Sequence, residues 1–264
     1  GNLKDASGIS FGYTDDNRLN YIYKDRNDST RFYYSPSGNR YLQVTRDKTG
    51  ETQIAYSNIY EQHKRSVGLV GERPKPKLER HRYYVSNGEG VFATIESNIH
   101  FLDPVDEGLP SDSGGIEKKN KVWYLHRDQL GSIVRITDEE GLLTGKLWFD
   151  AWGAKTVEVI NDSPKVPLGG KLLNSWSRGF TGHEHLDQYA LIHMNGRVYD
   201  PRLGMFTSPD PVALNYLNTQ ALGRYQYAFN NPLRYIDPTG YWSWDGALKG
   251  AVVGFVMGGP GGAA

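Results

Sequence analysis

The sequence predicts an all-β fold, and two observations carry this prediction. Tyrosine occurs 18 times among 264 residues, whereas methionine occurs only 3 times, and tyrosine favours half-buried positions on pleated strands. The 31 glycines and 13 prolines recur at short intervals between aromatic and aliphatic residues, a pattern typical of turns that separate short strands. The length suffices for one large domain or two ordinary ones.

A degenerate repeat occupies residues 1–60. Tyr13 is followed by TDDN and Arg18, Tyr34 is followed by SPSGN and Arg40, and a weaker copy, VTRDKTGE, occupies 44–51. In the first two copies an aromatic residue precedes turn-forming residues and an arginine. After the arginine, the chain returns to the alternating pattern of side chains that is typical of a strand. Each copy predicts a strand, a turn and a strand. An ordinary β-meander with polar turns is the alternative.

The middle of the chain alternates between strand-like and polar stretches. Residues 83–100 and 121–160 have strand periodicity, with Asn87-Gly88 as a hairpin turn. The second stretch contains two turn units 12 residues apart, TDEEG and FDAWG. We expect polar loops at 103–120 and 161–178.

Residues 61–82 are basic and contain two prolines. We expect them to form a solvated connection between strands, and a basic docking surface is the alternative.

Composition excludes several classes of function. The 30 basic and 30 acidic residues balance, so bulk charge predicts no binding to nucleic acid or to an anionic membrane. Without cysteine the chain has no disulfide or thiolate chemistry. The sequence contains no phosphate-binding loop, no GxGxxG and no GxSxG, and no apolar run long enough to span a membrane.

The richest motifs lie between Gly179 and Tyr241. Three Asp-Pro pairs begin at positions 200, 210 and 237, and the last belongs to the sequence DPTG. Arg197 begins the sequence RVYDP, and Asp210 follows it by 13 positions. Hydrolysis of a peptide by carboxylates needs two such groups close together, one ionised and one protonated. A guanidinium can hold one of them ionised and fix its geometry.

This region closely resembles the core segment of Rhs proteins, also called YD-repeat proteins. The box YLHRDQLGS at 124–132 matches the family pattern Y-x-H-x-D-x-L-G-S, and the repeats in residues 1–60 resemble the YD repeat. The resemblance implies a curved sheet of short hairpins that winds into a hollow shell, with the core domain plugging one end. It also implies that the chain has three parts: a repeat segment at 1–120, the core domain at 121–241 and the start of an effector at 242–264.

In the autoproteolytic members of this family, the chain cuts itself directly after the DPxG motif. The resemblance therefore implies an aspartyl-type, single-turnover reaction in which Asp210 and Asp237 are the catalytic pair and Arg197 orients them. The cut would fall between Tyr241 and Trp242, where the family often has leucine before the cut. Asp200 is expected to shape a turn.

The same resemblance implies a shell that encapsulates a C-terminal toxin and releases it. Its expected partners are the toxin domain, a cognate immunity protein, a secretion apparatus or partner shell component, and the target cell. No cofactor, metal or nucleic acid is expected for this region. We expect a bacterial protein that is secreted or delivered from the cell surface, with any signal outside the 264 residues. The composition changes after residue 241. We expect the sequence to be part of a longer chain at both its N-terminal and its C-terminal end.

Three alternatives remain open at this level. A YD-repeat shell can be structural or adhesive without proteolysis, and abundant tyrosine and tryptophan also fit a carbohydrate-binding β-solenoid. His183, His185 and His193 could suit a zinc site, although structural histidines are favoured. His126 is expected to pack or hydrogen-bond within a strand.

Overall fold

The computed structural model describes residues 2–6, 8–67, 75–87, 90–101, 116–159, 176–211 and 223–241. Within these ranges the chain forms strands and three short 3₁₀ helices, and no helix there is long and apolar enough to cross a membrane. The all-β prediction is confirmed.

Thirteen strands form one antiparallel sheet, the wall, in which every strand pairs with its neighbours in sequence. They are β1 (Asp5–Ala6), β2 (Ile9–Tyr13), β3 (Leu19–Asp25), β4 (Asp28–Tyr34), β5 (Arg40–Asp47), β6 (Gly50–Ser57), β7 (Tyr60–Val67), β8 (Lys75–Asn87), β9 (Gly90–Phe101), β10 (Ile116–Arg127), β11 (Ile133–Thr137), β12 (Leu143–Phe149) and β13 (Lys155–Val159).

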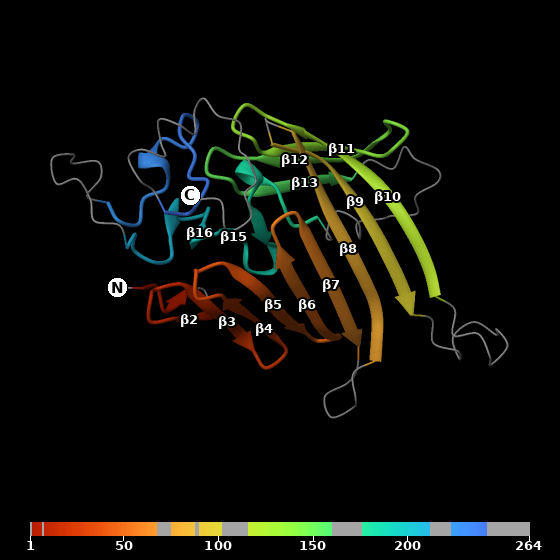
Figure 1. Cartoon of the computed structure of the whole chain (residues 1–264). Helices are drawn as coiled ribbons and strands as arrows, with labels where there is room; N and C mark the ends of the chain where they lie inside the picture. Colours follow the sequence, from red (N-terminus) through yellow and green to blue (C-terminus); the bar gives the residue numbers. More distant parts are fainter. Residues whose placement is uncertain are drawn as a thin grey trace.

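A second, small sheet contains β14 (Glu184–Leu186), β15 (Leu191–Met194), β16 (Arg197–Asp200) and β17 (Met205–Phe206). The 3₁₀ helices are η2 (Phe180–Gly182), η3 (Asp187–Tyr189) and η5 (Ala228–Asn230). In Figure 1 the wall curves from β2–β5 through β8–β10 to β11–β13, and β15 and β16 lie within the curve. The wall is curved as expected, but its described strands end at two separate edges, β1 and β13, so they do not close into a barrel.

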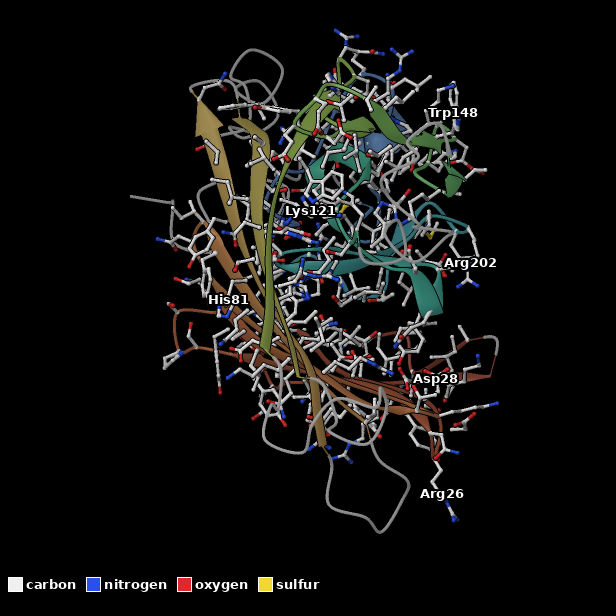
Figure 2. The ribbon with its side chains drawn as sticks, turned by 90° about the vertical axis from the view of Figure 1, so that its right-hand side faces the viewer. Arg26, Asp28, His81, Lys121, Trp148 and Arg202 are labelled. Carbon is white, nitrogen blue, oxygen red and sulfur yellow. The ribbon has the colours of Figure 1, made fainter. Side chains whose placement is uncertain are left out.

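The small sheet is buried on both faces. On one face Leu191 and Val198 pack with Ile22 and Phe32 of the wall. On the other face a cluster of aromatic and aliphatic residues surrounds Tyr199. Figure 2 shows side chains filling the space between the two sheets, while Arg26 and Arg202 extend outwards from turns. All residues of β14, β15 and β16 are consequently buried, which fixes the position of anything attached to them.

The repeat arginine of the second copy helps to attach the small sheet to the wall. Arg40 forms an ion pair with Glu184 of β14 and lies 4.1 Å from the ring centroid of Tyr56. Tyr56 donates a hydrogen bond of 3.0 Å to the same carboxylate. Because a buried charge without a partner is costly, each group requires the others in place.

The wall turns share one hydrogen-bonding device. Asp138 accepts hydrogen bonds through Oδ1 from the N–H groups of Glu140 and Leu142, at 3.2 and 2.8 Å. Gly141 in this turn has φ of +80°, a conformation that costs a residue with Cβ. The same Asp-to-Gly arrangement recurs in the turns that begin at Asp128 and Asp150. The two turn units TDEEG and FDAWG are thus confirmed as turns between strands.

Two of the expected loops are partly wrong. Most of residues 61–82 belong to β7 and β8, and residues 116–120 belong to β10. The prediction was wrong because charged side chains suggested a solvated loop, whereas partners on neighbouring strands neutralise them. Buried Arg82, for example, forms ion pairs with Glu61 and Glu96. Residues 103–115 and 161–175 of the loops expected at 103–120 and 161–178 lie outside the described residues. Residues 120 and 121, where we expect the repeat segment to meet the core, both lie in β10.

We expect Gly141→Ala to lower the free energy of unfolding by about 1 kcal/mol, because its Cβ would meet nothing within 4 Å but φ would stay positive. Gly153→Ala should cost more, since its Cβ would lie 2.6 Å from the ring of Phe180. Chemical denaturation measures both losses. Gly141→Asn is the control and should lose less, because asparagine tolerates this conformation. Equal losses for the two alanine variants would contradict the role of Phe180.

Candidate functional site

Arg197 begins strand β16 immediately after the turn that joins β15 to β16. Asn195 and Gly196 form this turn, and Asn195 has φ of +60°. Asparagine tolerates this left-handed conformation better than most residues that carry a Cβ, and an Asn-Gly pair is a common sequence for a two-residue hairpin turn. The register pairs Met194 with Arg197. The hairpin therefore delivers a guanidinium to a buried position at one end of the small sheet.

One nitrogen of Arg197 contacts two carboxylates. Its Nη2 lies 2.9 Å from Oδ2 of Asp210 and 3.5 Å from Oδ2 of Asp237. All three side chains are at most 5% exposed. Asp210 follows β17, while Asp237 is 27 positions further along the chain, so tertiary folding alone brings the pair together. The structure thus gathers the three residues that the sequence motif singled out.

The rest of the guanidinium is fully engaged. Nη1 donates to the carbonyl of Arg224 at 3.0 Å, and Nε donates to the carbonyl of Gly240. The guanidinium carbon lies 3.7 Å from the centroid of the Phe206 ring, a cation–π geometry. These contacts fix the plane of Arg197, so the positions of both carboxylates relative to Gly240 are fixed as well.

The DPTG loop, residues 237–240, is held against the β15–β16 turn. The N–H of Gly196 donates to the carbonyl of Thr239 at 2.8 Å, and Nδ2 of Asn195 donates to the carbonyl of Pro238 at 3.0 Å. Gly240 has φ of +69°, and a Cβ there would lie 1.9 Å from the carbonyl oxygen of Met194. Only glycine fits this position, which explains the final residue of the motif.

His183 supports the same loop from the other side. Burial lowers its pKa to about 4, so the ring is neutral near pH 7 and only one nitrogen carries a proton. Nε2 lies 3.2 Å from the carbonyl of Pro238 and Nδ1 lies 2.8 Å from the hydroxyl of Thr181. A carbonyl can only accept, so Nε2 donates to Pro238 and Nδ1 accepts from Thr181.

The other histidines of the open zinc alternative also contact protein groups. His185 accepts a hydrogen bond from the N–H of Phe180 through Nε2, and Nε2 of His193 lies 3.3 Å from the hydroxyl of Tyr34. In the described part of the chain no three metal-binding side chains cluster in a way that could hold an ion. His126 contacts the hydroxyl of Thr137 on the neighbouring strand.

The two carboxylates are in different electrostatic settings. Burial raises the pKa of Asp237 to about 6, and the charge of Asp210 adds to this effect while Arg197 opposes it. Burial also lowers the pKa of Arg197 below its ordinary value, against the attraction of both aspartates. Asp210 has the closer contact with the guanidinium. The raised pKa means that Asp237 keeps its proton to a higher pH than an exposed aspartate does.

Tyr241 follows the DPTG loop directly. The hydroxyl of Thr239 lies 2.9 Å from its carbonyl oxygen and 3.1 Å from its amide nitrogen. The hydroxyl can donate to that carbonyl while it accepts from the N–H. Trp242, the expected residue after the cut, lies outside the described residues.

Asp200 contacts Arg202 rather than the groups of this cluster. It forms an ion pair of 2.7 Å with Arg202 and accepts a hydrogen bond from the same residue's N–H. This is the turn-shaping position expected for it. Asn195, Gly196 and Thr239 also hold the DPTG loop in place. Their contacts with this loop are not evident from the sequence, although the Asn-Gly pair before Arg197 is a turn signal.

Comparison with known proteins agrees with this architecture. Residues 115–233 match the sequence model of the Teneurin YD-shell family. Over these residues the chain is similar to a YD-shell. The match includes the YLHRDQLGS box, Arg197 and Asp210, so the resemblance to Rhs and YD-repeat proteins is confirmed.

A nuclease and a toxin are among the relatives of this chain. The tRNA nuclease WapA of Bacillus subtilis is 30% identical over 124 residues, which cover 47% of this chain and 5% of WapA. The toxin protein Tse5 of Pseudomonas aeruginosa is 28% identical over 120 residues, which cover 46% of this chain and 8% of Tse5. The chain thus spans less than a tenth of the length of these curated relatives.

A crystal structure of TcdB2-TccC3 without its hypervariable C-terminal region shares the fold. It superposes with a TM-score of 0.69 at 18% identity, over 91% of this chain and 10% of that chain. The likeness in fold to this structure therefore extends over nearly the whole of this chain, beyond the part that the family match covers.

We expect Gly240→Ala to displace the DPTG loop, because its Cβ would collide with the carbonyl of Met194. The N–H of Gly196, which donates to Thr239, should then exchange with deuterium at least tenfold faster. Hydrogen exchange with peptide-level mass readout measures this rate. Gly141→Ala, on a remote wall turn, is the control and should leave the rate unchanged. Equal protection in both variants would show that Gly240 is not required for the seating of the loop.

Proposed function

We propose that this protein is a toxin-bearing YD-shell that cuts its own chain after Tyr241 and so releases the polypeptide that follows. One observation carries the proposal: a single buried guanidinium binds two buried carboxylates and also the carbonyl of Gly240, the residue before Tyr241. The toxins among the relatives support the second half of the proposal.

The chemistry proposed is hydrolysis by a pair of aspartates. Asp210, which has the closer ion pair with Arg197, acts as the base and takes a proton from water. The oxygen of that water adds to the carbonyl carbon of Tyr241, while Asp237 gives its proton to the carbonyl oxygen. As this intermediate collapses, Asp210 gives its proton to the nitrogen of Trp242, one hydroxyl of the intermediate returns a proton to Asp237, and the bond between Tyr241 and Trp242 breaks.

Several contacts favour this assignment. The raised pKa of Asp237 keeps part of it protonated near neutral pH, as a general acid requires. The hydroxyl of Thr239 supplies a hydrogen bond to the carbonyl of Tyr241. The bond to be cut belongs to the same chain as the catalytic groups, so a high effective concentration compensates for a small catalytic apparatus.

The proposal extends to the parts of the chain and to its partners. Residues 1–120 serve as repeat wall, 121–241 as the core domain with the cutting site, and 242–264 as the beginning of the effector. The partners are that effector, a cognate immunity protein, a secretion or shell component and the target cell. The reaction needs no cofactor, and the protein is secreted by or delivered from a bacterium.

A structural or adhesive shell without proteolysis is the rival function. It shares the wall and the small sheet but gives no reason for two buried carboxylates beside one arginine, since burying charge is costly. Intact-mass measurement of the protein as its cell produces it separates the two functions. A new N-terminus at Trp242 supports cleavage, and an uncut chain or a terminus elsewhere refutes it.

Asp210→Asn and Asp237→Asn should each reduce cleavage at least a hundredfold, because an amide is nearly isosteric with a carboxyl group but cannot transfer the proton. Arg197→Lys should also slow the reaction, since an ammonium cannot hold two carboxylates and a carbonyl in one plane. Asp138→Asn, on a wall turn, is the control and should cleave at the parental rate. Parental cleavage by all three site variants would rule out the carboxylate mechanism.

The rate of cleavage should fall about tenfold for each pH unit above 6, because Asp237 must carry a proton and its pKa is about 6. The folded state holds this proton more tightly than the unfolded state, whose pKa is near 3.8. The group's contribution to stability is thus present below pH 3.8 and is lost as the pH rises through 6. To measure the rate, the uncut protein is denatured and refolded in buffers from about pH 5 to 8, and the fraction of cut chain is followed over time by intact-mass measurement. A rate that rises across this range would contradict the role of Asp237 as an acid.

A further inference from the structure

The side chain of Tyr241 contacts a residue from the opposite end of the chain. Nε of Arg18 donates a hydrogen bond of 3.1 Å to the Tyr241 hydroxyl, across 223 positions of sequence. Arg18 is the arginine of the first repeat copy and lies in the turn between β2 and β3. A motif that the sequence analysis assigned to wall building thus reaches the residue before the proposed cut.

Neighbouring turns hold Arg18 in place. Its Nη1 forms an ion pair of 3.1 Å with Asp16, and its guanidinium carbon lies 5.8 Å from the ring centroid of Tyr34. A Cβ on Gly38 would lie 2.2 Å from Nη2 of Arg18. The glycine of the second repeat turn therefore leaves the space that the arginine of the first turn occupies.

Gly196 forms the other side of the space around Tyr241. A Cβ on Gly196 would lie 2.2 Å from Cε2 of the Tyr241 ring. The backbone of this turn thus packs directly against the ring, and a side chain at position 196 would displace the ring. A flat ring fits against Gly196, and a hydroxyl at its far end reaches Arg18.

From these contacts we propose that Arg18 and Gly196 form a specificity pocket for tyrosine at position 241. Gly196 accepts the flat ring and Arg18 binds the hydroxyl, so the pocket positions the carbonyl of Tyr241 next to Thr239. A branched aliphatic residue at 241 has no group for Arg18 and leaves its Nε–H without this acceptor. The inference rests on the proposed cleavage, and it makes the first repeat turn part of the cutting site.

A double-mutant cycle tests the pocket. Tyr241→Phe removes only the hydroxyl and Arg18→Gln removes only the guanidinium, so each should slow cleavage about tenfold, as expected for the loss of a hydrogen bond to a charged group. The double variant should be no slower than either single variant. Arg26→Gln makes the same exchange at an exposed arginine on another wall turn, and it should stay within about twofold of the parental rate.

A second cycle makes the test independent of catalysis. The same substitutions are introduced with Asp237→Asn, and thermal unfolding is measured on the uncut protein. Each single variant should lower the unfolding temperature, and the double variant should lower it no further. The pocket would be overturned if the effects of the two substitutions were additive on both the cleavage rate and the unfolding temperature. It would also be overturned if Arg18→Gln changed neither quantity. If the parent protein is not cut but the thermal cycle shows coupling, the proposed cleavage fails and the pocket stands.

Discussion

The candidate site depends on the burial of one guanidinium. Arg197 is placed by a hairpin turn and must find partners for its charge in a buried setting. It does so with two aspartates, two backbone carbonyls and an aromatic ring, contributed by residues between positions 206 and 240. Among the described residues of this stretch, the regular elements are the end of β17 and the short helix η5. The arginine therefore organises the loops around it, and its loss would disorder the site as well as change its charge.

A similar constraint acts where the small sheet meets the wall. The inner face of the wall carries charged residues, so the small sheet can dock only with matching charges. Arg40 pairs with Glu184, and Arg178 pairs with Glu61 at 2.9 Å. Buried pairs of this kind add little stability compared with apolar contacts, but they penalise a shifted register strongly, because one shift leaves several charges unpaired. The docking is therefore specific, which a site assembled from distant segments requires.

The sequence predicts the strands and turns of this fold well where glycine and aspartate mark each turn, as at Asp138 and Gly141. It fails at residues 61–82, because charge resembles a solvated loop when the partner strand is unknown. The motif identifies Arg197, Asp210 and Asp237, but their approach depends on tertiary folding. The role of Arg18 could not be read from its repeat, since the same position in the second copy, Arg40, binds Glu184 instead.

The topology of the wall also sets an order of events during synthesis. Each of its thirteen strands pairs with a sequence neighbour, so hairpins can form one after another as the chain leaves the ribosome. Tyr241 emerges after every wall strand, and only then can it reach Arg18 in the first repeat. A cut that needs this contact cannot precede the synthesis of these thirteen strands. The direction of translation would thus delay the proposed cut until the chain of this wall segment has been made.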